Sequence, residues 1–367
     1  MKVAGVHRRT IWPTEDGEAV EIIDQRHLPH EWRVARLAQI DAVHHAIADM
    51  WVRGAPLIGV TAAYGLALQC RHAATDAALT EAKAYLDGAR PTAVNLAWAT
   101  ERMVSALRAL PEAERASAAW ALAAALADED VATNAAIGRH GLDILRSLAA
   151  RHPHRPLNVL THCNAGWLAT VDWGTAIAPI YQAHEAGLAV HVWVDETRPR
   201  NQGASLTAWE LGQAGIPHTV VADNTGGHLM QHGLVDVVIV GTDRVSARGD
   251  VCNKIGTYLK ALAAHDNGVP FYVAMPFSTL DPTLNDGLAE IPIEARSPRE
   301  VTHITGRDAT GRRVEVQLTP DGSPALNYGF DVTPARLVTG LITERGVLAA
   351  QEAAIRDALA RSPSPAP

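Results

Sequence analysis

The sequence predicts an α/β protein in which a parallel sheet, covered by helices on both faces, follows a smaller N-terminal domain of short strands and helices. Three observations predict this class. The chain of 367 residues is too long for one typical hydrophobic core. The segment "RHPHRP" at 151–156 interrupts a long helical pattern. After it, short apolar runs alternate with helical stretches, a pattern typical of parallel strands joined by crossover helices.

The expected N-terminal domain covers residues 1–150. Two short strands are predicted within "AVEIIDQ" (19–25) and "WRVARL" (32–37), separated by the turn-prone "RHLPHE". From about residue 38 onward, apolar residues recur at helical spacing and alanine is frequent. Both features favour helices up to the interruption at 151, and the alanine content reflects helix propensity rather than function.

The expected C-terminal domain covers residues 151–360. Its strands are predicted at 157–161, 189–194, 218–222, 236–241 and 270–274. The intervening helices are predicted at about 173–186, 205–214, 226–232 and 254–265. The last residues, "RSPSPAP" at 361–367, are predicted to form a disordered tail because they are polar and rich in proline.

The composition excludes several classes of function. A formal net charge of -8 provides no overall attraction to nucleic acid or to an acidic membrane, so an anionic ligand would need a local group of cations. The three cysteines, Cys70, Cys163 and Cys252, are odd in number and far apart, which disfavours a disulfide framework. The sequence has no hydrophobic leader and no apolar run of roughly 18 residues. These features predict a cytoplasmic protein with neither a nucleic-acid nor a membrane partner.

Polar residues follow four of the predicted strands. The groups are 162–164 (HCN), 195–198 (DETR) with Gln202, 223–225 (DNT) and 242–244 (TDR). Any one of them taken alone is as well explained by a helix cap or a turn. Because the carboxyl ends of parallel strands meet at one edge of a sheet, four such groups in succession favour a shared ligand site there.

Cys163 follows the first of these strands, and its position leaves three interpretations open: a packing residue, a metal ligand or a catalytic group. Metal ligation is disfavoured because no His or Cys pair has chelating spacing. His162 and Cys163 would also point to opposite sides of a continued strand. The sequence contains neither G-x-G-x-x-G nor G-x-x-x-x-G-K-[ST], which disfavours a nicotinamide dehydrogenase or a P-loop enzyme.

A second candidate cluster lies in the helical half. In "RGAPLIGVTAAYGLAL" (53–68), Pro56 suits a first helical turn and is preceded by Arg53, Gly54 and Ala55. Free N–H groups at a helix start, next to an arginine, suit a phosphate. Arg90 repeats the arrangement before another proline. The alternative is an ordinary helix start with small residues for close packing.

These stretches together resemble the methylthioribose-1-phosphate isomerase family. Its members are aldose–ketose isomerases of methionine salvage, related to regulatory subunits of a translation-initiation nucleotide-exchange factor. The resemblance extends from about residue 1 to 350. It is carried by "RGAPLIGVTAAYG", "RPTAVNL", "THCNAG", "VDETRPRNQGASLTAWEL", "ADNTGG", "VIVGTDRVSARGDVCNKIGTY", "PFYVAMPFSTLD" and "FDVTPARLVTGLITERG".

The resemblance implies a Rossmann-like C-terminal domain, a homodimer, a sugar phosphate substrate, no metal and no cofactor. It implies conversion of 5-methylthio-α-D-ribose 1-phosphate to 5-methylthio-D-ribulose 1-phosphate. The catalytic pair falls on Cys163 and Asp243. The substrate-binding positions fall on Arg53, Gly54, Ala55, Arg90, Gln202, Asn253 and Lys254. Cys70 and Cys252 are expected to be packing residues.

In this chemistry Asp243 would protonate the ring oxygen, and Cys163 would either carry the carbon-bound proton or stabilise charge during a hydride shift. Two segments depart from the family pattern. Arg200 and Asn201 precede Gln202 where apolar residues are more usual, and "ALNYGFDVTP" differs from the commoner form. Three alternatives stay open: an isomerase of 5-deoxyribose 1-phosphate, an isomerase of ribose 1,5-bisphosphate, or a non-catalytic subunit of the exchange-factor kind.

Overall fold

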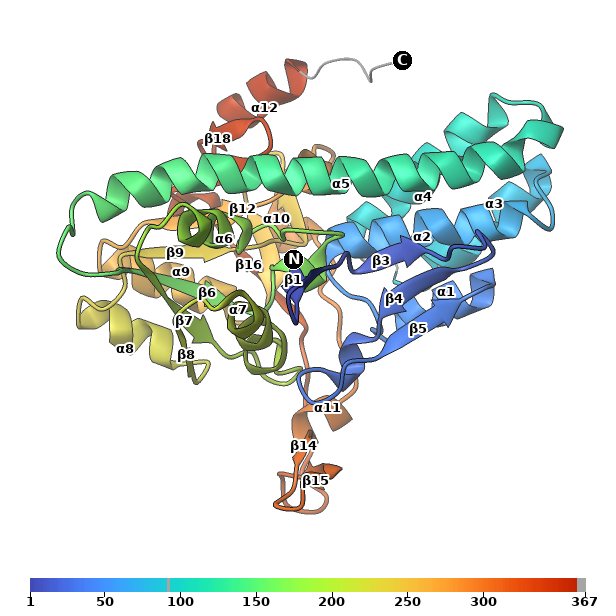
Figure 1. Cartoon of the computed structure of the whole chain (residues 1–367). Helices are drawn as coiled ribbons and strands as arrows, with labels where there is room; N and C mark the ends of the chain where they lie inside the picture. Colours follow the sequence, from blue (N-terminus) through green and yellow to red (C-terminus); the bar gives the residue numbers. More distant parts are fainter. Residues whose placement is uncertain (91–92, 362–367) are drawn as a thin grey trace.

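The structure is a computed structural model that describes residues 1–90 and 93–361 (Figure 1). Residues 91 and 92, which belong to the block "RPTAVNL", lie outside the described residues. So do residues 362–367 of the expected tail. A mainly helical half and a sheet-containing half lie side by side, and the long helix α5 passes over both (Figure 1).

The first 37 residues form a small hairpin and a three-stranded antiparallel sheet. The strands are β1 (Lys2–Val3), β2 (Val6–His7), β3 (Ile11–Pro13), β4 (Val20–Ile23) and β5 (Val34–Leu37). The two predicted strands are β4 and β5, whereas β1 to β3 are too short to show an alternating pattern. Ile11, Ile22 and Leu37 are buried in the same core as the following helices, so this sheet covers the helical half.

The prediction of helices after residue 38 is confirmed. They are α1 (Ile40–Ala48), α2 (Ala55–Cys70), α3 (Asp76–Asp87), α4 (Val94–Arg108) and α5 (Glu112–Ala149). Helix α2 is buried on nearly all sides because α1, α3, α4 and α5 all pack against it. This explains why its sequence is apolar around the whole helix rather than on one face. The surrounding helices hold its N-terminus in one position.

Helix α5 joins two hydrophobic cores. It has 38 residues and is therefore about 57 Å long. In its first half Ala123 and Leu126 are buried with α2, and in its second half Ile137 and Leu145 are buried against the sheet. The chain thus passes from one core to the other within a single helix. The domain boundary expected near residue 150 lies at the end of this helix and stays a prediction.

The second core is built on a seven-stranded sheet with the order β18-β17-β12-β9-β6-β7-β8. The strands are β6 (Leu157–His162), β7 (Val190–Asp195), β8 (His218–Val221), β9 (Val237–Val240), β12 (Phe271–Ala274), β17 (Gly340–Thr343) and β18 (Gly346–Leu348). Neighbouring strands are parallel except for the edge pair β17–β18. This confirms the α/β class and five predicted strands. The other two were missed because each has only three or four residues and begins with glycine.

Helices cover both faces of the sheet. On one face α6 (Ala178–Glu185) and α7 (Ala208–Ala214) pack with α5. On the other lie α8 (Thr225–Gln231), α9 (Thr257–Asp266) and α12 (Glu352–Ala360). Successive strand residues alternate between these faces, so Val159 belongs to the first core and Leu160 to the second. The helix predicted at 254–265 was placed too early, because residues 251–254 are a strand and the helix begins at Thr257.

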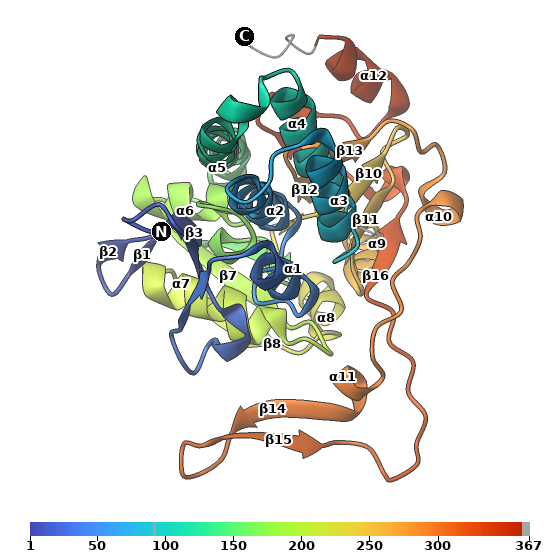
Figure 2. The same ribbon diagram turned by 90° about the vertical axis from the view of Figure 1, so that its right-hand side faces the viewer.

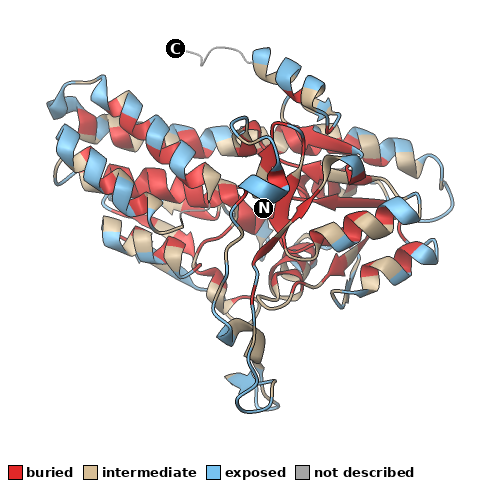
Figure 3. Ribbon diagram, turned by 180° about the vertical axis from the view of Figure 1, so that it is seen from behind, coloured by how far each residue is buried: buried red, intermediate tan, exposed pale blue. Residues whose placement is uncertain are grey.

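A four-stranded sheet, β13-β10-β11-β16, stands beside the main one. Its strands are β10 (Arg244–Ser246), β11 (Val251–Lys254), β13 (Leu280–Asp281) and β16 (Phe330–Thr333). Between β13 and β16 come α10 (Gly287–Glu290), α11 (Arg299–Thr302) and the hairpin β14 (His303–Arg307) and β15 (Arg313–Gln317). This hairpin projects from the body (Figure 2) and is largely exposed, whereas the central strands are buried (Figure 3). Within residues 1–90 and 93–361, no helix combines the length and apolar character that crossing a bilayer needs.

Candidate active site

A narrow pocket lies at the carboxyl edge of the central sheet, beyond the ends of β6 and β9. Its walls come from the segment before α2, the loops after β6 and β9, and the end of β11. The structure brings together here all nine residues predicted for the site: Arg53, Gly54, Ala55, Arg90, Cys163, Gln202, Asp243, Asn253 and Lys254. This is the edge at which open parallel sheets bind ligands. The individual roles of the nine residues stay predictions.

The pocket leaves about 40 Å³ of free space, which is room for a few water molecules but not for a sugar phosphate. A neighbouring cavity of about 390 Å³ shares three wall residues with it, Met50, Arg53 and Gln202. A sugar bound at Cys163 would therefore either widen the pocket or extend past these shared walls into the larger cavity.

The start of α2 forms one wall of the pocket. Gly54 caps this helix with φ of +92°, and a Cβ atom at this position would lie 2.4 Å from the Ala169 carbonyl oxygen. Only glycine therefore lets α2 begin so close to the turn at Trp167–Ala169. The unpaired N–H groups and the positive end of the helix dipole make this helix start favourable for an anion.

Arg53 connects this helix start to the loop after β6. Its guanidinium donates from Nη2 to the Asn164 carbonyl oxygen at 2.6 Å and from Nη1 to the Asn164 side-chain oxygen. Burial lowers the pKa of Arg53, whereas the nearby Cys163 and Asp243 act in the opposite direction. The sequence places Asn164 only among the polar residues at a strand end. Its contact with Arg53 spans 111 residues of chain, and no local pattern indicates it.

Cys163 is held in an unusual backbone conformation. Its φ is +64°, a region that non-glycine residues seldom occupy, and its carbonyl oxygen accepts a hydrogen bond from Thr207 Oγ1 at 2.6 Å. The buried thiol donates to Gln202 Oε1 at 3.0 Å. Thr207 ends a π-helical turn (Gly203–Thr207) that directly follows Gln202. Burial raises the pKa of Cys163, while the positive charges of Arg53 and Lys254 oppose the rise.

The opposite wall carries Asp243, Asn253 and Lys254. The Asp243 backbone N–H donates to the Cys252 carbonyl oxygen at 3.0 Å, which places Asp243 beside the end of β11. The Asn253 amide donates to Thr257 Oγ1 at 3.0 Å. Lys254, predicted at a helix start, instead ends β11 and lies with its ammonium 4.5 Å from the centre of the Phe330 ring. Burial lowers the pKa of Lys254, and the negative charges available on Cys163 and Asp243 oppose this.

Arg90 lines the pocket and is the last described residue before the pair 91–92. Its Nη2 lies 3.5 Å from Glu294 Oε2. Its buried Nε has no hydrogen-bond partner among the described residues. A buried donor without a partner is costly, so Arg90 retains hydrogen-bonding capacity for a ligand. Arg53, Arg90 and Lys254 give the pocket an excess of positive charge.

His162 and Cys163 do not form a chelating pair. Its Nδ1 lies 2.6 Å from Asp195 Oδ2, and its Nε2 lies 2.8 Å from the Ile255 carbonyl oxygen. Lys260 pairs with the same Asp195 oxygen at 2.9 Å. Both ring nitrogens are therefore occupied by structural contacts. In the described part of the chain, no group of three or more His, Cys, Asp or Glu side chains is placed to hold a metal ion.

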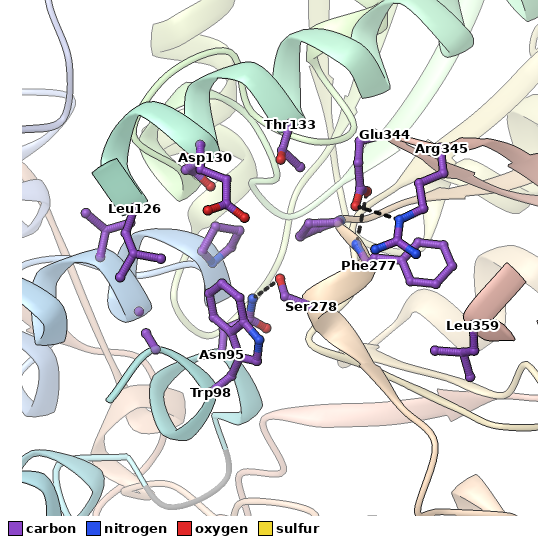
Figure 4. Close-up of a pocket in the computed structure, with 16 residues that line it drawn as sticks. Asn95, Trp98, Leu126, Asp130, Thr133, Phe277, Ser278, Glu344, Arg345 and Leu359 are labelled. Carbon is purple, nitrogen blue, oxygen red and sulfur yellow. Dashed lines mark hydrogen bonds and ion pairs between the residues drawn. The ribbon is translucent and has the colours of Figure 1, made fainter. Parts of the chain in front are cut away.

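A different cavity, of about 270 Å³, lies behind the start of α2 and shares Pro56 and Pro276 with the predicted site (Figure 4). Several of its polar groups bond to each other or to the backbone. Asn95 donates to Ser278 at 3.0 Å, and Glu344 accepts from the Phe277 N–H at 3.1 Å. Burial raises the pKa of Asp130 to about 7. The cavity has three carboxylates, no cysteine and a single arginine in its lining, so it suits an anionic phosphate less well than the pocket at Cys163.

Comparisons with known proteins agree on the family. The profile of the initiation factor 2 subunit family matches residues 51–350. The chain is similar to the methylthioribose-1-phosphate isomerase of Rhodospirillum centenum, with 66% identity over 352 residues that cover 96% of this chain and 94% of the relative.

Two solved structures have the same fold over nearly the whole chain. The crystal structure of 5-methylthioribose 1-phosphate isomerase from Pyrococcus horikoshii OT3 is 38% identical, with a TM-score of 0.83 and 97% of each chain covered. The translation initiation factor eIF-2B subunit delta from A. fulgidus is 37% identical, with a TM-score of 0.76 and coverage of 94% of this chain and 96% of that one.

Proposed function

Because the chain belongs to the initiation factor 2 subunit family and, within it, to the methylthioribose-1-phosphate isomerases, we propose that it converts 5-methylthio-α-D-ribose 1-phosphate to 5-methylthio-D-ribulose 1-phosphate. The observation that carries the proposal is the meeting of Cys163 and Asp243 in one pocket with two arginines and a lysine. A subunit that only binds a partner has no need of a thiol and a carboxyl group facing a small cationic pocket. The reaction would serve methionine salvage.

The phosphate binds at the start of α2. Arg53 and Lys254 supply buried charge, Arg90 supplies the unpaired Nε–H, and the N–H groups of Gly54 and Ala55 supply neutral donors. The phosphate stays on C1 in both substrate and product, so these contacts persist through the reaction. They fix the position of C1 and C2 while the hydrogen moves.

Ring opening needs an acid, because a sugar 1-phosphate is a cyclic acetal without a free carbonyl group. The carboxyl group of Asp243 donates a proton to the ring oxygen as the bond from C1 to that oxygen breaks. The Asp243 carboxylate then accepts the proton of the 2-hydroxyl group as the ketone forms at C2. The residue ends each turnover with the proton that it had at the start.

The hydrogen on C2 reaches C1 by one of two balanced routes. In the first, the C2–H electron pair moves to C1 as a hydride, and Cys163 stabilises the positive character at C1. In the second, the Cys163 thiolate removes the C2 proton to form an enediol and returns it to C1. Burial raises the pKa of Cys163, which disfavours the thiolate that the second route needs and so favours the first route.

Assembly and location follow the family expectation of a cytoplasmic homodimer. The three cysteines are all unpaired and buried, in agreement with a reducing compartment. Light scattering on a sizing column measures the assembly directly. A mass of two chains supports the homodimer, and a mass of one chain contradicts it.

A ³¹P and ¹³C NMR time course with 5-methylthioribose 1-phosphate in D₂O tests the activity. The expected result is a new ketone carbon with the phosphate retained, abolished by Asp243→Asn and strongly reduced by Cys163→Ala. Deuterium at C1 of the product identifies the proton route. If no ketone forms, even with the 5-deoxy and 1,5-bisphosphate analogues, the enzyme proposal is wrong and a regulatory role takes its place.

A further inference from the structure

Glu210 is a fully buried carboxylate that holds the loop carrying Cys163. It lies in the first turn of α7, where its Oε1 accepts the Leu168 N–H at 2.8 Å and the Asn164 amide at 3.0 Å. Its Oε2 accepts the Trp167 N–H at 3.0 Å and the Tyr181 hydroxyl at 2.8 Å. Glu210 therefore receives four hydrogen bonds, three of them from residues 164–168.

The chain leaves space for this carboxylate at Gly166. A Cβ atom there would lie 1.9 Å from Glu210 Oε2, so any larger residue would displace the carboxylate. The closeness of the contact indicates that the loop after β6 is shaped around Glu210. The contact with Glu210 therefore explains why residue 166, the last of "THCNAG", is glycine.

Two contacts pass from this carboxylate to the pocket. The Asn164 amide nitrogen bonds to Glu210, which orients the Asn164 side-chain oxygen toward Arg53. The same amide nitrogen also bonds to Thr207 Oγ1 at 3.1 Å, and Thr207 in turn donates to the carbonyl oxygen of Cys163. One buried network therefore sets both the position of the Arg53 guanidinium and the strained backbone of Cys163.

We propose that Glu210 is a positioning residue of the active site, which acts through Asn164 to hold Arg53 beside the Cys163 thiol. The role rests on the proposed isomerase function, because it assigns Arg53 to the phosphate and Cys163 to the hydrogen transfer. Glu210 itself does not touch the reacting atoms. It keeps in place two groups that come from segments far apart in the chain, the residue before the start of α2 and the loop after β6.

An amide cannot replace this carboxylate. All four partners approach as donors, and a glutamine has one acceptor oxygen and one NH₂ group. In either orientation of the amide, one backbone N–H of Trp167 or Leu168 would face the NH₂ group. Asn164 could relieve a clash only by turning its own amide, which would present N–H to Arg53. Glu210→Gln should therefore loosen the link from Asn164 to Arg53.

The reactivity of the Cys163 thiol reports this link without needing substrate. Three charged or titratable groups bear on the thiol: Arg53 before α2, Lys254 on β11 and Asp243 after β9. Glu210 bears on Arg53. The Arg53 charge favours the thiolate, so displacement of Arg53 should move thiolate formation to higher pH. A general loss of stability would not by itself move thiolate formation to higher pH.

The test is the pH profile of Cys163 alkylation by iodoacetamide, followed by peptide mass spectrometry, together with steady-state isomerase kinetics. In the same digest, Cys70 and Cys252 are internal references, because burial raises their pKa to about 11 and about 12. Glu210→Gln and Asn164→Ala should each move the Cys163 profile to higher pH and lower kcat/KM about 10²-fold. The double variant should lose little more, because both act through one contact.

Asp236→Asn is the matched control. Asp236 is a half-buried carboxylate at the opposite end of β6, where it accepts the Asn158 N–H at 2.8 Å and pairs with Arg155. Its loss should lower the melting temperature but leave the Cys163 profile unchanged. The proposal is overturned if Glu210→Gln leaves that profile in place, or if Asp236→Asn moves it equally. If the wild-type protein has no isomerase activity but Glu210→Gln still moves the Cys163 profile, the role of Glu210 is supported and the proposed reaction is refuted.

Discussion

Replacing Gly54 by alanine should disable the predicted phosphate site and destabilise the fold. The backbone at Gly54 has φ of +92°, which costs a residue with a Cβ atom about 1–3 kcal/mol. The new Cβ would also lie 2.4 Å from the Ala169 carbonyl oxygen and 2.5 Å from its Cα atom. These are backbone atoms, so the start of α2 or the Ala169 turn must move, at a further cost of about 1–3 kcal/mol.

The two terms together predict a loss of about 2–6 kcal/mol for Gly54→Ala. At about 2 °C per kcal/mol for a large domain, the melting temperature should fall by about 4–12 °C. Gly187 supplies a matched control, because it has φ of +77° but nothing within 4 Å of its Cβ position. Gly187→Ala therefore carries only the backbone term, about 1–3 kcal/mol, and should lower the melting temperature by about 2–6 °C.

Differential scanning calorimetry measures both melting temperatures, and initial-rate kinetics measures the consequence for the substrate. Gly54→Ala should raise KM and lower kcat/KM because the donors of Gly54 and Ala55 move, whereas Gly187→Ala should leave both constants unchanged. Equal melting temperatures for the two variants would refute the steric argument. Unchanged kinetics for Gly54→Ala would refute the placement of the phosphate at the start of α2.

Three further predictions follow from the same contacts. Cys163→Ala should lower kcat about 10²- to 10⁴-fold. Cys70→Ala, at the buried end of α2, should reduce thermal stability but leave kcat unchanged. Enzyme assays of both variants test this. Arg53→Lys should raise KM about ten- to hundredfold, because a lysine cannot reproduce the two hydrogen bonds to the loop after β6, and substrate titration measures this. The Arg155 pair lowers the pKa of Asp236 below its usual 3.8, so the pair stabilises the fold above that pH and its contribution is lost as the pH falls through the lower folded value. Urea unfolding of Asp236→Asn and wild type should therefore differ by about 1–2 kcal/mol at pH 7 and converge in strong acid.

The central strands could be predicted because their signal is local. Strands such as β6 and β9 are short apolar runs bounded by polar residues, and their limits were predicted to within one residue. The start of α2 was equally visible, since Pro56 suits a first helical turn. The edge pair β17–β18 was missed because runs of three or four residues beside a glycine have too little pattern of their own. The pairing of β17 with β12 depends on a neighbour nearly 70 residues away.

The position of Lys254 illustrates a different limit. Its neighbours "CNKIGTY" are compatible with the start of a helix, and the helix was placed from residue 254 onward. In the structure, Val251–Lys254 pair with Phe330–Thr333, which extends the strand through Lys254 and delays the helix to Thr257. A strand partner about 80 residues away thus overrode the local preference.

Residue patterns along the chain predict the fold class and the five central strands, and motifs that resemble a known family predict the nine residues that line one pocket. How those residues are held follows from contacts between distant segments. The contact of Arg53 with Asn164 spans 111 residues of chain, and the contact of Asn164 with Glu210 joins the loop after β6 to α7, 46 residues later. Periodicity and residue type report only on neighbours along the chain. Buried hydrogen bonds between distant segments form only when packing brings the segments together and excludes water, so that each buried polar group must find its partners within the protein.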